Sequence, residues 1–223
     1  MQQTIIKTPQ HIAVFGGTFC PIHRGHLEVA LFLQKQLNFG LFLFLPNKAP
    51  VLDKEATALY VHRLAMLRLA LAPYPNFKID RREIDRPTPS FMVDTLASLR
   101  QELGDGVAIS LIIGIDSFQQ LHRWHDWQTL FTLCNLIVMD RPGYESSILP
   151  NLINARLIQG EIHEIKDPLI LATTSRGGFY RCNAGRYDIS STTIRALIQR
   201  GDDATPFLPA AVSTYIKEKK LFI

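Results

Sequence analysis

Two adjacent glycines and two histidines stand close together near the amino end of the 223-residue chain. Gly16-Gly17 follows the apolar run 12–15, and His23 and His26 come shortly after it. Adjacent glycines let a backbone turn tightly and present N–H groups to an anion. A helix that begins near Gly25 directs its positive dipole end to the same place, within reach of both imidazoles. The segment therefore predicts a phosphate-binding loop with two imidazole donors.

Other sites that glycines and histidines build fit this segment less well. A dinucleotide fingerprint needs G-x-G-x-x-G and a P-loop needs G-x-x-x-x-G-K-S/T, and neither string occurs in the sequence. A zinc site needs three or four ligands, but His23 and His26 have no Cys or Glu partner at motif spacing. A plain turn followed by solvated histidines remains the alternative if these residues are considered in isolation.

The elements that must position these residues alternate between short apolar runs and longer amphipathic stretches. The expected strands are 12–15, 41–45, 77–79, 109–113 and 136–139, with 169–172 as a candidate last strand. The expected helices are 26–37, 59–71, 91–103, 128–133, 190–199 and 209–219. Fully apolar short strands between helices indicate a parallel sheet that is covered on both faces.

The pattern predicts the α/β class, with a doubly wound, mostly parallel sheet and helices at the carboxyl end of the chain. The ligand crevice of such a sheet lies at the carboxyl ends of its strands. We expect a single domain over residues 1–223, with a core of about 12–200 and a last helix at 209–219. No repeat or linker divides it.

Composition and net charge limit the classes of protein to which this chain could belong. Hydrophobic residues make up 47% and charged residues 20%, as in ordinary folded domains, and a net charge of +4 is too small to indicate a nucleic-acid surface. Three widely spaced cysteines without C-x-x-C favour a reducing compartment. The polar N-terminus and the short apolar runs predict neither a signal peptide nor a membrane span. We expect a cytoplasmic protein without membrane or nucleic-acid partners.

Two motifs, about 165 residues apart, resemble the signatures of the nucleotidylyltransferase superfamily. Residues 17–26 (GTFCPIHRGH) are similar to its H-x-G-H motif, and residues 189–195 (ISSTTIR) to its I-S-x-T-x-I-R motif. Within the superfamily, the chain most resembles the bacterial nicotinate-nucleotide adenylyltransferases. Further segments that carry this likeness are 45–47, 89–96, 113–117 with Trp124, and 141–144.

The resemblance implies a Rossmann-like nucleotidylyltransferase fold and a reaction. The adenylyl group of ATP would pass to nicotinate mononucleotide, giving nicotinate adenine dinucleotide and pyrophosphate. His26 would stabilise the transferring phosphoryl group, and His23 would hold phosphate oxygens beside it. Further ATP contacts are expected from Gly16, Gly17, Thr18, Asp116, Arg141, Ser190, Thr192 and Arg195. Contacts with nicotinate mononucleotide are expected from Phe19, Lys48, Thr95 and Trp124.

The metal expected in this reaction is Mg²⁺ that arrives with ATP, because no acidic cluster indicates a metal site of the protein's own. Two of the nucleotide-binding residues have a structural alternative. Asp116 binds a ribose hydroxyl or caps the next short helix, and Ser190 binds phosphate or serves as an N-cap.

Two departures from the family pattern stand out. Cys20 occupies a position where the family usually has Asp or Asn, and we expect it to pack rather than react. Residues 50–54 differ from the family's P-P-H-K string. The alternatives to nicotinate mononucleotide are nicotinamide mononucleotide and phosphopantetheine as acceptors, and a nucleotide-binding regulator without catalysis. The sequence makes no prediction of the oligomeric state.

Overall fold

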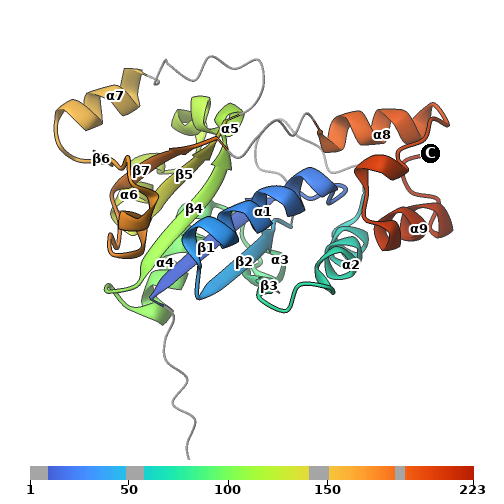
Figure 1. The fold of residues 1–223 in the computed structure, drawn as a ribbon, viewed down its shortest axis with the longest axis horizontal. Coiled ribbons are helices and arrows are strands. Elements are labelled where there is room, and N and C mark those ends of the chain that lie inside the picture. Colours follow the sequence, from blue (N-terminus) through green and yellow to red (C-terminus); the bar gives the residue numbers. More distant parts are fainter. Residues whose placement is uncertain (1–9, 49–57, 141–150, 184–188) are drawn as a thin grey trace, which may run out of the picture.

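The computed structural model describes residues 10–48, 58–140, 151–183 and 189–223 (Figure 1). Within these residues, seven strands form one parallel sheet in the order β3-β2-β1-β4-β5-β7-β6. The strands are β1 (His11–Gly17), β2 (Leu41–Pro46), β3 (Phe77–Ile79), β4 (Ala108–Gly114), β5 (Asn135–Met139), β6 (His163–Glu164) and β7 (Gly178–Cys182). The predicted doubly wound α/β fold is confirmed.

The strand order reverses beside β1. The chain runs from β1 to β2 and β3 on one side, and then returns to place β4 on the other side of β1. Phe15 of β1 accordingly pairs with Phe44 of β2 and with Ile112 of β4. In open α/β sheets, the reversal leaves a crevice at the carboxyl ends of the two diverging strands. The crevice is therefore expected where β1 and β4 end.

Helices cover both faces of the sheet. Alternate residues of β1 belong to different clusters, because Ala13 packs in one core and Ile12 and Val14 in the other. The first core includes side chains of α1 (Arg24–Leu37), α2 (Tyr60–Leu71), α8 (Ser191–Gln199) and α9 (Ala210–Glu218). The second includes side chains of α4 (Met92–Leu103), α5 (Ile115–Gln119), α6 (Leu130–Leu133) and α7 (Asn151–Ile158). The shorter elements are α3 (Arg82–Asp85), η1 (Leu121–Arg123), η2 (Trp127–Thr129), η3 (Pro168–Ala172) and η4 (Thr205–Phe207).

The last part of the sheet differs from the sequence prediction. Residues 169–172 were expected as a strand, but they belong to the 3₁₀ helix η3, in which Asp167 accepts a hydrogen bond from the Leu169 N–H (3.0 Å). The last strand is instead β7, whose residues lack a continuous apolar run. The expected helix 128–133 is divided into η2 and the four-residue α6.

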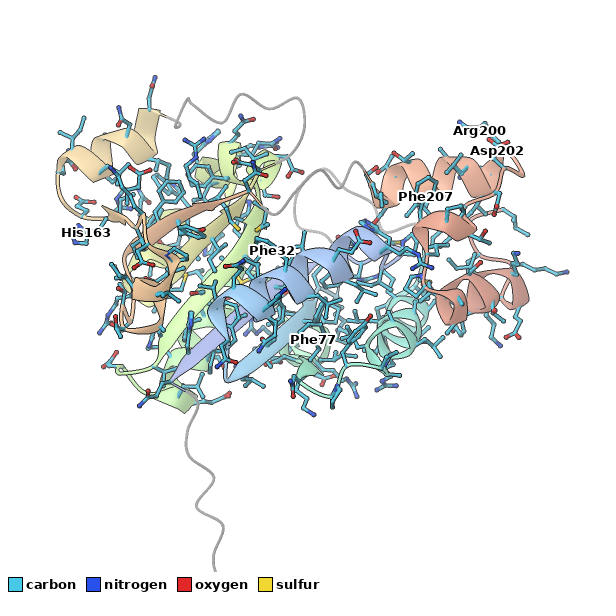
Figure 2. All side chains as sticks on the ribbon, viewed as in Figure 1. Phe32, Phe77, His163, Arg200, Asp202 and Phe207 are labelled. Carbon is cyan, nitrogen blue, oxygen red and sulfur yellow. The ribbon has the colours of Figure 1, made fainter. Side chains whose placement is uncertain are left out.

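The C-terminal helices pack on one side of the sheet, beside α2 (Figure 1). Tyr215 of α9 contacts His62 of α2, with 3.0 Å between the hydroxyl and Nδ1. At the outer end of α8, Arg200 and Asp202 form an exposed ion pair with 2.8 Å between Nε and Oδ2 (Figure 2). Exposed ion pairs add little stability, so apolar packing of α8 and α9 fixes the position of α8.

Candidate active site

A cleft of about 920 Å³ opens at the carboxyl ends of the central strands. The ends of β1, β4 and β5 line it, together with the amino ends of α1, α4 and α8 and several residues between positions 116 and 125, among them Asp116, Trp124 and His125. This is the place that the reversal of strand order predicts. Three helices of eight or more residues, α1, α4 and α8, therefore direct their positive dipole ends toward the same space.

The last two residues of β1, Gly16 and Gly17, and the turn that follows them line this cleft. Residues 16–19 together are called the glycine-rich turn below. A Cβ atom on Gly16 would lie 2.7 Å from the Met92 methyl group, and one on Gly17 would lie 3.1 Å from the Phe19 ring. Phe19 itself has a left-handed φ of 47°, which residues other than glycine rarely adopt. Its ring is buried and packs edge-on against His26, with 5.2 Å between ring centroids. The turn is thus compact, and its backbone lies close to the cleft.

Both predicted histidines line the cleft at the start of α1. His23 is the N-cap residue and His26 lies in the first turn, with 3.6 Å between their ring centroids. The Nδ1 atom of His26 accepts a hydrogen bond from the backbone N–H of His23 (3.3 Å). An accepting Nδ1 carries no proton, so the neutral ring has its proton on Nε2. His26 can therefore donate from Nε2 while it remains uncharged.

The second motif is joined to the first by direct hydrogen bonds. Ser191 donates through Oγ to the Pro21 carbonyl (2.9 Å), and Arg195 donates through Nη1 to the Cys20 carbonyl (2.8 Å). Arg195 also donates to the Thr192 hydroxyl (3.3 Å). Because these contacts bridge about 170 residues of sequence, the two motifs form one structural unit at the cleft.

Ser190 is the N-cap of α8. Its hydroxyl accepts a hydrogen bond from the Thr193 N–H (3.0 Å), as the structural alternative expects. Ser190, Thr192 and Arg195 also line the cleft. The capping role and a phosphate contact are compatible, because a hydroxyl that accepts from a backbone N–H still has a proton to donate.

Asp116 and Trp124 lie on the wall formed after β4. Asp116 is the second residue of α5, whose N-cap is Gly114, so the N-cap alternative for Asp116 is wrong. Trp124 follows η1 and is half-buried against the second core. Next to it, His125 stacks on Phe91 with 4.3 Å between ring centroids. All three of Asp116, Trp124 and His125 line the cleft, and His125 had not been predicted from the sequence.

Two predicted site residues, Thr95 and Lys48, do not line the cleft in the part of the chain that the structure describes. Thr95 is fully buried, and its hydroxyl donates to Oε1 of Glu83 (2.9 Å). Lys48 is exposed and does not line the cleft, although its backbone N–H donates to the Ser90 hydroxyl (3.2 Å). Arg141 lies outside the described residues, as does the segment 50–54. Cys20 is buried in the first core, in agreement with a packing role.

Glu83 is a cleft residue that sequence reasoning missed. It is 2% exposed and is among the residues that line the cleft, and Ser90 donates to its backbone carbonyl (3.5 Å). Burial raises the pKa of its carboxyl group to about 7, although the hydrogen bond from Thr95 and the charge of Arg86 act in the opposite direction. An acidic residue in a stretch as charged as residues 80–86 gives no signal of burial, so only the structure reveals it.

Comparisons with known proteins agree with this geometry. A model of the cytidylyltransferase-like family matches residues 14–197. A protein of Legionella pneumophila (strain Paris) named "probable nicotinate-nucleotide adenylyltransferase" is 42% identical over 211 residues, which cover 95% of this chain and 98% of that protein. A protein of the same name from Yersinia pestis (strain Pestoides F) is 39% identical over 219 residues, or 97% and 98% of the two chains. This chain belongs to the nicotinate-nucleotide adenylyltransferases of the cytidylyltransferase-like family.

Solved structures share the fold at low sequence identity. The nicotinic acid mononucleotide adenylyltransferase of Plasmodium falciparum, complexed with NaAD, has a TM-score of 0.69 and 18% identity over 96% of this chain and 97% of that one. The same protein complexed with APC has a TM-score of 0.64 and 15% identity over the same shares of the two chains. These matches support the Rossmann-like architecture. In the described part of this chain, no helix combines the length and the apolarity needed to cross a membrane.

Proposed function

We propose that this protein transfers the adenylyl group of ATP to nicotinate mononucleotide, giving nicotinate adenine dinucleotide and pyrophosphate. One observation carries the proposal. The glycine-rich turn, two histidines and the amino ends of α1 and α8 converge on one cleft, although the two motifs are far apart in sequence. Backbone N–H groups and helix amino ends are the groups that bind phosphate oxygens. The full-length relatives that share 39 to 42% identity carry the corresponding name.

The reaction is an in-line displacement at the α-phosphorus of ATP. A 5′-phosphate oxygen of nicotinate mononucleotide forms the new P–O bond, and the bond to the bridging oxygen of pyrophosphate breaks. Such a transfer asks the protein mainly to position two anions and to stabilise the charge on the transferring group. Nε2 of His26, a neutral donor at the amino end of α1, is placed for the second task. His23 and the N–H groups of the glycine-rich turn hold the neighbouring oxygens.

The lining residues divide between the substrates. On the α8 side, Ser190, Thr192 and Arg195 bind the pyrophosphate part of ATP. On the wall formed after β4, Asp116 accepts from ribose hydroxyls of ATP, and Trp124 offers an indole face to the pyridine ring. Thr95 contributes through Glu83 rather than by touching the mononucleotide.

Mg²⁺ enters as part of the ATP substrate. Its ligands are then phosphate oxygens and water, which suits an ion that gives up water reluctantly. The described residues contain no cluster of three or more His, Cys, Asp or Glu side chains able to hold a metal ion.

Pyrophosphate release tests the proposal. The protein is incubated with ATP and Mg²⁺ and, in separate reactions, nicotinate mononucleotide, nicotinamide mononucleotide or phosphopantetheine. The proposal expects pyrophosphate release with nicotinate mononucleotide at a rate at least about tenfold above the rates with the other acceptors. An acceptor that leaves one buried polar group of the site without its hydrogen bond reacts more slowly by at least this factor. Preference for another acceptor would move the substrate but keep the chemistry. Binding of ATP without any release would indicate a regulator.

A further inference from the structure

A buried arginine lies directly beneath the glycine-rich turn. Arg63, on α2, has no exposed surface, which makes it the largest fully buried side chain in the described residues. Its guanidinium donates to the backbone carbonyls of Thr18 (2.7 Å), Asn47 (2.8 Å) and Lys48 (2.7 Å). It also donates to the Asn47 side-chain oxygen (3.3 Å). Three of the four hydrogen bonds made by the two terminal nitrogens of the guanidinium thus go to backbone oxygens.

These carbonyls belong to the carboxyl ends of two neighbouring strands. Thr18 follows β1, and Asn47 and Lys48 follow β2. Asn47 strengthens the junction, because its backbone N–H donates to the Gly17 carbonyl (3.2 Å) and its amide nitrogen to the Thr18 hydroxyl (3.4 Å). Thr18 and Asn47 line the cleft, whereas Arg63 is not among its described lining residues. Arg63 therefore acts on the cleft from behind.

The geometry of the peptide unit connects these bonds to the cleft. In a trans peptide, the carbonyl and the following N–H point in opposite directions. The pair after β2 shows this directly: the Asn47 carbonyl accepts from Arg63, and the Lys48 N–H donates to Ser90 on the cleft side. By the same rule, a Thr18 carbonyl directed at α2 turns the Phe19 N–H toward the cleft that Thr18 and Phe19 line.

We propose that Arg63 is a positioning residue for the phosphate-binding turn: by holding the Thr18 and Asn47 carbonyls it directs the Phe19 N–H at substrate phosphate. The inference rests on the function proposed above. It also accounts for the left-handed φ of Phe19, since a fixed Thr18 carbonyl restricts the next residue. Lysine cannot replace this role, because an ammonium group lacks the planar fork that reaches three carbonyls together.

The chain offers a matched control. Arg100, on α4, is 8% exposed and also donates to backbone carbonyls, among them those of Val107 (2.6 Å) and Ser175 (3.1 Å) and that of Leu133. These three residues precede β4, β7 and β5, so Arg100 works at the amino ends of the strands. It does not line the described cleft. The two arginines have the same bonding but opposite places in the sheet.

Arg63→Lys and Arg100→Lys are compared by thermal unfolding and by kcat and KM for pyrophosphate release, at a temperature where both variants are folded. Both substitutions should lower Tm. Only Arg63→Lys should lower kcat, by at least about tenfold relative to Arg100→Lys, because small displacements of groups that stabilise a transition state cost this much. Arg63→Lys with the kcat of Arg100→Lys would overturn the proposal.

A second measurement needs no variant. In the ¹⁵N-labelled wild-type protein, MgATP should shift the Phe19 amide resonance more than the amide resonances near Arg100. A Phe19 amide that does not respond to bound MgATP would also overturn the proposal, even if Arg63→Lys does not fold. If the wild type and Arg100→Lys release no pyrophosphate with any acceptor, the function proposed above fails instead, while the amide response still tests the role of Arg63.

Discussion

A buried arginine binds backbone carbonyls at each end of the strands. The carboxyl ends of the strands form what we call the carboxyl edge of the sheet, and their amino ends form the amino edge. At the carboxyl edge, Arg63 binds the carbonyls that follow β1 and β2, next to a cleft. At the amino edge, Arg100 binds the carbonyls that precede β4, β5 and β7. Both arginines satisfy backbone oxygens that the strands leave unpaired. In the part of the chain that the structure describes, the cleft of about 920 Å³ lies beside the carbonyls that Arg63 binds.

The contrast extends to the glycines. At the carboxyl edge, Gly16 and Gly17 keep the backbone close to the cleft. At the amino edge, Gly178 is needed for packing, because a Cβ atom there would lie 2.8 Å from the Asn135 side-chain oxygen and would overlap the Ile165 side chain. Substitutions at the two edges should therefore separate activity from stability.

The largest effect is expected for His26→Ala. The variant should fold normally but lose at least about 100-fold in kcat, because it removes a preorganised donor at the transferring phosphoryl group. His122→Ala is the control, since His122 is exposed and does not line the described cleft. Steady-state kinetics on both variants checks this. A folded His26→Ala enzyme with near-normal kcat would remove His26 from its proposed role.

The opposite result, lower stability with unchanged activity, is expected for Gly178→Ala. The added methyl group should reduce the free energy of unfolding by about 2 kcal/mol through overpacking, with kcat unchanged below the unfolding temperature. Gly106→Ala is the control, because a Cβ atom there meets nothing within 4 Å. Denaturant titration measures both. A lower kcat in a fully folded Gly178→Ala protein would contradict the assignment of activity to the carboxyl edge and of stability to the amino edge.

A smaller and selective effect is expected for Trp124→Ala. Loss of the stacking surface should raise KM for nicotinate mononucleotide by about tenfold and leave KM for ATP within about twofold. Trp127→Ala, which removes an indole that packs on Phe131 rather than in the described cleft, should lower stability without this selectivity. Equal changes in both KM values would make Trp124 a structural residue.

The smallest effect is expected from the titration of Glu83. Its pKa is raised by burial from 4.5 to about 7, so the folded state favours the protonated form. Stability from this group is complete below pH 4.5 and declines as pH rises through 7. Relative to Glu83→Gln, which keeps an acceptor for Thr95, the wild type should lose on the order of 1 kcal/mol between pH 5 and 8. Parallel Tm profiles for the two proteins would contradict this.

Sequence and structure agree where local pattern is strong. The apolar runs that became β1, β2, β4 and β5 were predicted within a few residues, because continuous branched and aromatic residues favour buried parallel strands. By contrast, β7 was missed, since Gly178 and Arg181 interrupt its apolar character and its position depends on pairing with β5. Both motif histidines were found from their spacing, and the structure brings them to the cleft.

The residues that sequence reasoning could not find act through distant partners. Arg63 lies on the helix α2, where an arginine is ordinarily solvated, and its proposed role comes from carbonyls 15 to 45 positions away. Glu83 and Thr95 form a buried pair across 12 positions, so a threonine that the family likeness assigns to substrate binds a neighbouring carboxyl group and does not line the described cleft. Every residue type has a backbone carbonyl, so a side chain that binds backbone oxygens does not require particular residue types as partners. A single sequence therefore shows no motif for it.

The most direct test of the carboxyl-edge assignment is a crystal structure of the protein with nicotinate adenine dinucleotide. The account predicts that the dinucleotide phosphates lie between the amino ends of α1 and α8, with one phosphate oxygen within hydrogen-bonding distance of His26 Nε2. The Phe19 N–H should point at a phosphate, and the pyridine ring should lie against Trp124. A dinucleotide bound elsewhere, or phosphates directed away from His26, would contradict it.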